Sequence, residues 1–142
     1  LREFLSTTST KALTIRYVSH QNATGLNYIE LQHLLEAMIR NQLSEPDLGE
    51  AKLATQLGMS LRSLQRHLKL QETSYRKILV KVKREIACDR LSHSSESMKA
   101  IGEALGFSDS SNFSRAFRRW NGCSPSHYRR KKMLKRKKEL LP

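Results

Sequence analysis

The chain carries one short segment twice, and this internal repeat constrains the fold more than any other feature of the sequence. Residues 53–60 (LATQLGMS) align with residues 101–108 (IGEALGFS) at an offset of 48. Residues 64–68 (LQRHL) then align with residues 113–117 (FSRAF) at an offset of 49. The second copy therefore has one extra residue in or just after the turn. Two copies of similar length and order indicate that one helical unit is used twice.

Each repeated position suits a tight turn between two helices. A small residue is expected where the two helices cross closely. A glycine supplies the positive φ that such a turn often requires. The apolar residue after the glycine is expected to insert into the core beneath the turn. In this order, the residues are Ala54, Gly58 and Met59 in the first copy, and Gly102, Gly106 and Phe107 in the second.

The second helix of each copy carries an apolar stripe on one side only. Leu64 and Leu68 form it in the first copy, and Phe113 and Phe117 in the second, which leaves the opposite face outward. We expect these helices at 60–69, opened by Ser60 as N-cap, and at 109–119. The spacing of small residue, glycine and apolar residue is typical of a helix-turn-helix unit, in which the second helix contacts DNA.

Periodicity predicts helices for the rest of the chain as well, so the expected fold is all-α with about seven helices. A stripe spaced by three and four residues begins at Tyr28, and a long helix is expected from about Tyr75 to Leu91. Short helices are expected at 48–57 and 98–105. The stripe of the first helix consists of Ile29, Leu31, Leu34, Leu35, Met38, Ile39 and Leu43.

Polar breaks and composition divide the chain into five predicted parts. Ser44 or Asp47, in the break after the first helix, is the expected N-cap of the next one. A last helix is expected to begin near Ser126. The parts are a linker or remnant of an upstream effector domain (1–26), a first helix-turn-helix subdomain (27–72), a linker helix (73–92), a second helix-turn-helix subdomain (93–130) and a basic tail (131–142).

The charge distribution predicts a polyanionic partner for the C-terminal two thirds of the chain. Lys and Arg total 26 against 13 Asp and Glu, a net charge of +13. Only residues 27–58 are acidic on balance.

No apolar run approaches the ~20 residues of a membrane span, and no signal peptide opens the chain. The start at Leu1 suggests a fragment. The two cysteines show no pairing pattern, which favours a reducing compartment. The histidines have no metal-ligand spacing with each other or with the cysteines, so no metal site or cofactor is predicted.

On these motifs, the sequence resembles the AraC/XylS family of bacterial transcription regulators over about residues 28–130. The resemblance lies in residues 57–66 (LGMSLRSLQR), 105–117 (LGFSDSSNFSRAF) and 122–129 (GCSPSHYR). It implies two helix-turn-helix units on one chain. The sequence departs from the family pattern after the first unit. Glu72 replaces the usual glycine, and the following proline is missing near Tyr75.

The outward faces of the two helices carry side chains that can read base edges. Arg62 and Arg66 can pair bidentately with guanine, and Gln65 with adenine. The helix between the units, about 17 residues or roughly 25 Å at ~1.5 Å per residue, would place them about one DNA turn (~34 Å) apart. The resemblance implies base contacts by Arg62, Gln65, Arg66, Ser111, Asn112 and Arg115. We expect phosphate contacts by Ser60, Lys69, Arg76, Ser108, Arg118, Arg119 and Arg129.

The predicted function is sequence-specific binding of double-stranded DNA, in the cytoplasm and associated with the nucleoid. RNA polymerase is an expected partner, and a small-molecule effector would act only through a missing upstream domain. Two alternatives stay open. One is a basic RNA-binding or ribosome-associated helical protein. The other is an enzyme such as a DNA-repair alkyltransferase with a similar module, although no nucleophile with an evident base is present and no catalytic residue is predicted.

Overall fold

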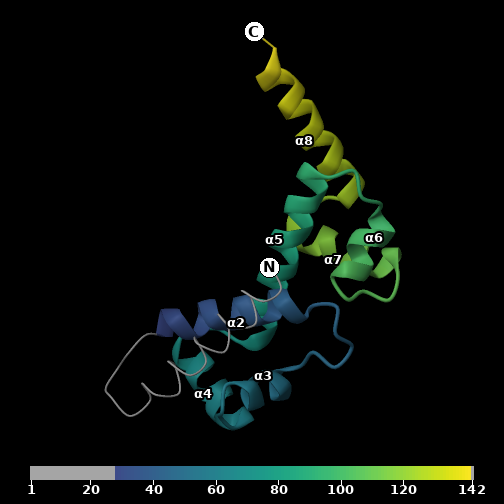
Figure 1. The fold of residues 1–142 in the computed structure, drawn as a ribbon. Coiled ribbons are helices and arrows are strands. Elements are labelled where there is room, and N and C mark those ends of the chain that lie inside the picture. The colour runs from purple at the N-terminus through teal and green to yellow at the C-terminus, as the bar shows by residue number, and fades with distance from the viewer. Residues whose placement is uncertain (1–27, 142) are drawn as a thin grey trace, which may run out of the picture. The chain divides into compact units, whose positions relative to one another are not determined.

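The computed structural model describes residues 28–141 and places seven α-helices there, with no strand in that range (Figure 1). The predicted all-α fold is confirmed. The predicted linker or remnant at 1–26 lies outside the described residues, as does the side chain of Ile29. The helices are α2 (Tyr28–Gln42), α3 (Glu50–Gln56), α4 (Leu61–Leu70), α5 (Tyr75–His93), α6 (Met98–Ala104), α7 (Ser110–Asn121) and α8 (Pro125–Leu140).

The described residues form two compact units, one ending at Val80 and the other beginning at Lys81. The division falls inside α5. The first unit holds α2, α3, α4 and the start of α5, and the second holds the rest of α5 with α6, α7 and α8. Each unit contains one copy of the repeat, α3 packed on α4 or α6 packed on α7. The boundaries given above for the five parts of the chain stay a prediction.

The core of the first unit is aliphatic. The apolar stripe predicted for α2 is buried along its length from Leu31 onward. Leu64 and Leu68 of α4 are also fully enclosed, with 0% and 1% of their surface exposed. Each such side chain stabilises the fold by about 1.5–3 kcal/mol relative to exposure. The other buried residues are Leu34, Leu35, Met38, Ile39 and Leu43 of α2, Leu53, Ala54 and Leu57 in and after α3, and Ile78 of α5.

The core of the second unit is built around aromatic rings. Phe113 and Phe117 of α7 are fully buried, and their ring centroids lie 5.9 Å apart in an edge-on arrangement. Phe117 also meets Tyr128 of α8 at 5.4 Å, again edge-on. Such edge-on pairs stabilise by about 0.5–1.5 kcal/mol beyond the area they bury. The predicted close crossing at Gly102 is confirmed, because a Cβ there would lie 3.1 Å from Cβ of Phe113.

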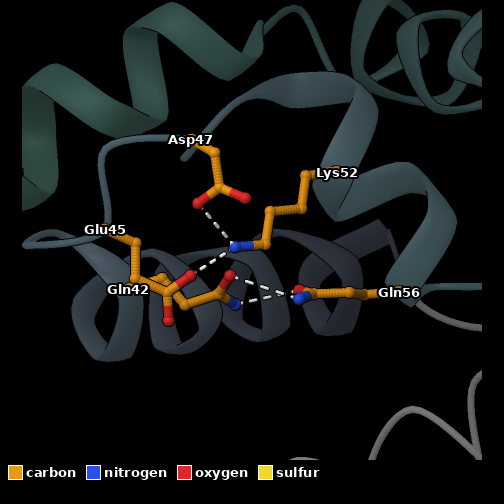
Figure 2. Close-up of polar contacts among 5 residues, drawn as sticks. All are labelled: Gln42, Glu45, Asp47, Lys52 and Gln56. Carbon is orange, nitrogen blue, oxygen red and sulfur yellow. Dashed lines mark hydrogen bonds and ion pairs between the residues drawn. The ribbon is translucent and has the colours of Figure 1, made fainter.

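The prediction that Ser44 or Asp47 caps α3 is wrong. The N-cap is Gly49, which offers no side-chain hydrogen bond. Asp47 instead accepts a hydrogen bond from the Lys52 ammonium at 2.9 Å, and Glu45 contacts the same ammonium (Figure 2). Lys52 lowers the pKa of the Asp47 carboxyl, mainly through this hydrogen bond. A cation in the first turn of α3 therefore holds the acidic side chains of the break.

A pair of amides closes the same connection between α2 and α3. Gln42, the last residue of α2, and Gln56, the last of α3, each donate a side-chain N–H to the other's oxygen, at 2.9 and 3.2 Å (Figure 2). The ends of the two helices are thus joined by reciprocal hydrogen bonds. Because both side chains reach the surface, we expect the pair to fix the relative direction of α2 and α3 more than to add stability.

Three helices end in the same hydrogen-bonded turn with left-handed backbone. After α3, the N–H of Gly58 bonds the Thr55 carbonyl and the N–H of Met59 bonds the Ala54 carbonyl, the Schellman arrangement. Gly106 and Phe107 repeat it after α6. The two glycines have φ of 70° and 82°, so the predicted positive φ is confirmed. In both turns the backbone N–H of the apolar residue bonds back to a carbonyl of the preceding helix.

The third such turn follows α4 and has Glu72 where glycine is usual. The N–H of Glu72 bonds the Lys69 carbonyl, and the N–H of Thr73 bonds the Leu68 carbonyl, both at 3.0 Å. Glu72 has φ of 56°, the only positive value at a non-glycine residue among the described positions. The turn therefore keeps its shape despite the substitution, with a residue that disfavours this backbone conformation.

We expect Glu72→Gly to stabilise the protein by about 1 kcal/mol, because it removes the Cβ crowding of the left-handed conformation. Chemical denaturation followed by circular dichroism measures the difference. Glu72→Ala is the matched control, since it removes the carboxylate and keeps the Cβ. Equal stability of the Gly and Ala variants would contradict backbone strain at this position.

Candidate nucleic-acid interface

The second helix of the first unit, α4, is the predicted DNA-contacting or recognition helix, and it is packed on one side and exposed on the other. Ser60 is its N-cap, as predicted, and its hydroxyl oxygen accepts the N–H of Ser63 at 3.1 Å. With the Leu64 and Leu68 stripe buried, Arg62 and Arg66 are exposed on the outer face. The helix thus presents two guanidinium groups to solvent, with no hydrogen bond or ion pair to either among the described residues.

Gln65 lies between these two arginines and is tied to the neighbouring helix. Its side-chain amide donates to Oε2 of Glu50, the first residue of α3, at 3.1 Å. Glu50 therefore orients an amide that is a candidate for adenine recognition and leaves its carbonyl oxygen and second N–H free to bond elsewhere.

The recognition helix of the second unit, α7, follows a longer turn. Residues 105–109 separate α6 from α7, whereas residues 57–60 separate α3 from α4, which confirms the predicted extra residue. Its N-cap is Asp109, whose carboxylate accepts the N–H of Asn112 at 2.7 Å. Phe113, Ala116 and Phe117 form its buried stripe. Ser111 and Arg115 are exposed on the outer face.

Asn112 is the centre of a hydrogen-bond network at the start of α7. Its side-chain N–H groups donate to Oγ of Ser108 and to Oδ2 of Asp109, both at 2.9 Å. Its carbonyl oxygen accepts a hydrogen bond from Nη2 of Arg115. The network orients the Arg115 guanidinium through Asn112. The structure thus brings together three of the predicted contact residues, Ser108, Asn112 and Arg115.

A shallow open hollow lies over this network. It is lined by Gly106, Phe107, Ser108, Asn112, Arg115 and Arg119. Phe107, expected to insert into the core, is only half-buried and forms the apolar floor, with its ring 5.7 Å from Phe113 and 6.0 Å from Trp120. The ammonium of Lys83 on α5 lies 4.7 Å from the same ring centroid, and burial lowers its pKa. The hollow therefore combines an apolar floor with cationic and amide side chains.

The residues predicted to contact phosphates differ in how exposed they are in the structure. Arg76, Arg118 and Arg119 are exposed, as are Ser60, Ser108 and Lys69. Arg129 is half-buried instead, and its Nε donates to the Leu91 carbonyl near the end of α5 at 3.3 Å. Its buried Nη2 has no hydrogen-bond partner. Arg129 is thus committed to joining α8 to α5, which leaves less of its guanidinium for a phosphate.

Some of the residues that shape the interface were missed by sequence reasoning. Asp109 was treated only as the start of a helix, although Asp directly before a helical stretch is a favoured N-cap. Lys83 of α5 was not singled out from the sequence, yet its ammonium lies over the Phe107 ring. No sequence pattern pointed to Glu50, because its contact with Gln65 depends on how α3 packs on α4.

Neither a metal centre nor a membrane-spanning helix is found in the described part of the chain. Within residues 28–141, no three His, Cys, Asp or Glu side chains gather as metal ligands would. No helix in the same range has the length and apolarity that crossing a bilayer requires.

Comparison with known proteins identifies relatives of this arrangement. The family described as a helix-turn-helix domain matches residues 53–131, which include both recognition helices. The ornithine utilization regulator of Pseudomonas aeruginosa is 37% identical over 121 residues, covering 82% of this chain and 35% of that protein. This chain therefore spans about a third of the length of that regulator.

Solved structures share the fold. The transcriptional regulator CdpR from Pseudomonas aeruginosa is similar with a TM-score of 0.71 and 27% identity, over 88% of this chain and 39% of that one. The DNA-binding domain of AdpA, solved in complex with a target DNA, is similar with a TM-score of 0.64 and 24% identity, over 74% of this chain and 95% of that one. At this last identity the likeness concerns the fold alone.

We expect Asp109→Ala to destabilise the second unit by about 1 kcal/mol, because the first turn of α7 loses its cap. Asp109→Asn is the matched control. Asn caps helices about as well as Asp, so we expect this variant to stay close to the parent protein. Urea denaturation followed by tryptophan fluorescence at Trp120, the single Trp of the chain, reports on this unit. If both variants lose the same stability, the cap is not the cause.

Proposed function

The chain belongs to the AraC-type helix-turn-helix family of sequence-specific DNA-binding regulators, and we propose that it reads an asymmetric duplex site with two recognition helices in successive major grooves. The observation that carries this proposal is the repeated unit itself. In each copy, a helix with a buried apolar stripe presents a polar outer face, α4 with Arg62, Gln65 and Arg66, and α7 with Ser111 and Arg115.

Base recognition is proposed to differ between the two helices. Arg62 and Arg66 of α4 extend into solvent, and each can donate two parallel hydrogen bonds to O6 and N7 of guanine. Gln65 suits N6 and N7 of adenine, with its direction set by Glu50. On α7, Arg115 is the proposed guanine reader, since Asn112 already holds its guanidinium. Asn112 and Ser111 are proposed to contact bases from the same helix.

Phosphate contacts are proposed to fix the register of both helices on the duplex. Lys69 and Arg76 serve the first unit, and Arg118 and Arg119 the second, since all four are exposed cations. Ser60 and Ser108 lie at or next to a helix N-terminus, where phosphate oxygens are favoured. For Arg129 we propose only a weak phosphate contact, because its guanidinium already donates a hydrogen bond to the Leu91 carbonyl.

The rest of the regulator is proposed to lie outside this chain. Because this chain spans only about a third of the length of the ornithine utilization regulator, we propose that a domain that binds a small-molecule effector lies in the remaining part of the regulator. We further propose that the module acts in the cytoplasm, on nucleoid DNA, and contacts RNA polymerase. Residues 27–58, with five acidic and two basic side chains, are the natural face for a protein contact because they do not suit a polyanion.

Selection of binding sites from random duplex DNA tests the proposal directly. The chain is incubated with a library of about three helical turns, and bound duplexes are recovered and sequenced over several rounds. We expect one enriched site with two unlike halves. Recovery of random sequence, or preferential binding of single-stranded RNA in a competition with the same duplex, would overturn the proposal.

We expect Arg115→Ala to weaken binding to the selected duplex by ~1–3 kcal/mol and to relax preference at one half of the site. Arg118→Ala, on the same helix, is the control for loss of charge alone. It should weaken selected and scrambled duplexes alike. Fluorescence anisotropy with both duplexes measures the two effects. Uniform weakening by Arg115→Ala across unrelated duplexes would mean that Arg115 contacts the backbone rather than a base.

Affinity should fall steeply with salt, because bound cations displace counterions from the duplex. Five of the proposed phosphate contacts are cationic, and at ~0.9 per neutralised phosphate the slope of log K against log salt should be about −4 or steeper. A titration of binding between low and moderate salt gives this slope. An affinity that barely changes over the range would rule out the electrostatic part of the proposal.

A further inference from the structure

Helix α8 continues well past the packed part of the second unit as one uninterrupted helix to Leu140 (Figure 1). Its first turns are anchored. Tyr128 packs edge-on against Phe117 of α7, and Arg129 donates to the Leu91 carbonyl. Beyond this anchor the helix is largely solvent-exposed, and Met133 and Leu134 have 48% and 60% of their surface accessible. The α8 extension, residues 130–140, therefore projects from a fixed base beside α7.

The α8 extension is densely cationic. Seven of the nine residues from 130 to 138 are Lys or Arg, and none is acidic. Six of these cations are exposed and form no ion pair within residues 28–141. They are Arg130, Lys131, Lys135, Arg136, Lys137 and Lys138.

The arrangement of these charges on the helix points to a linear polyanion. Lys131, Lys135 and Lys138 follow the i, i+4, i+7 spacing and so form one stripe. The exposed apolar residues of the extension are interrupted on their own face by Arg130 and Lys137, so they make no continuous apolar strip. A peptide interface needs an apolar centre, a bilayer needs an apolar face, and a second copy would bring like charges together.

We propose that the α8 extension binds the phosphate backbone of duplex DNA flanking the half-site read by α7. The inference rests on the proposed function, because it needs α7 to be seated on DNA. The 11 residues from Arg130 to Leu140 span ~16 Å at ~1.5 Å per residue. This length covers about five base pairs at ~3.4 Å each. The extension thus adds affinity without adding sequence preference.

The test replaces the lysine stripe by glutamine in one triple variant, Lys131→Gln, Lys135→Gln and Lys138→Gln. Glutamine preserves helix propensity and removes the charge. We expect the slope of log K against log salt to become shallower by about 2–3, at ~0.9 per lost phosphate contact. The preference for the selected duplex over a scrambled one should stay unchanged. The matched control carries arginine at the same three positions and should keep the parent slope.

A shortened duplex and an anionic membrane supply the outcomes that would overturn the proposal. Removing about five base pairs of flank beside the α7 half-site should weaken binding by the parent chain more than binding by the glutamine variant, which keeps Arg130, Arg136 and Lys137. An unchanged salt slope in the glutamine variant, with duplex preference intact, would leave α8 as a solvated helix. If the glutamine variant lost the binding to phosphatidylserine–phosphatidylcholine vesicles that the parent chain shows, while its DNA titrations stayed unchanged, the α8 extension would be a membrane-binding helix instead. Failure of the proposed function itself would give a different result: the parent chain would bind the selected and the scrambled duplex equally well.

Discussion

The left-handed turn between the two helices of each unit is the constraint on which the interface depends. At Gly58 and Gly106 the backbone reverses direction within a few residues, and the two Schellman hydrogen bonds satisfy carbonyls that the helix end would otherwise leave open. The backbone N–H of the apolar residue that follows each glycine bonds a carbonyl of the preceding helix. This geometry fixes the angle at which the second helix leaves the turn, so that its apolar stripe faces inward and its polar face outward.

The two outer faces are organised by different means. On α4 the two arginines extend freely, and only Gln65 is held, through a contact from α3. On α7 a chain of hydrogen bonds runs from Asp109 through Asn112 to Arg115 within the helix's own first turns. A side chain that is already oriented loses less conformational entropy on binding. Arg115 of α7 is oriented in this way, whereas, among the described residues, Arg62 and Arg66 of α4 are not.

The elements were predictable from the sequence because local signals and packing agree. The apolar stripes of α2, α4 and α7, the positive φ at both turn glycines and the longer second turn were all expected and are present. Even Glu72, a departure from the family pattern, keeps the backbone conformation that glycine would adopt. The N-cap of α3 was predicted wrongly, since Asp47 had the right chemistry but is held by Lys52 instead. Contacts between helices, such as Glu50 with Gln65, were not predictable because no local pattern encodes which side chains meet.

Hydroxyl-radical footprinting of the chain on its selected duplex tests the central claim most directly. If one chain reads a two-part, asymmetric site, two protected tracts should appear on one face of the duplex, about one helical turn (10–10.5 base pairs) apart. The base sequences beneath the two tracts should be unlike. A single protected tract, or two identical tracts related by a two-fold axis, would contradict the account.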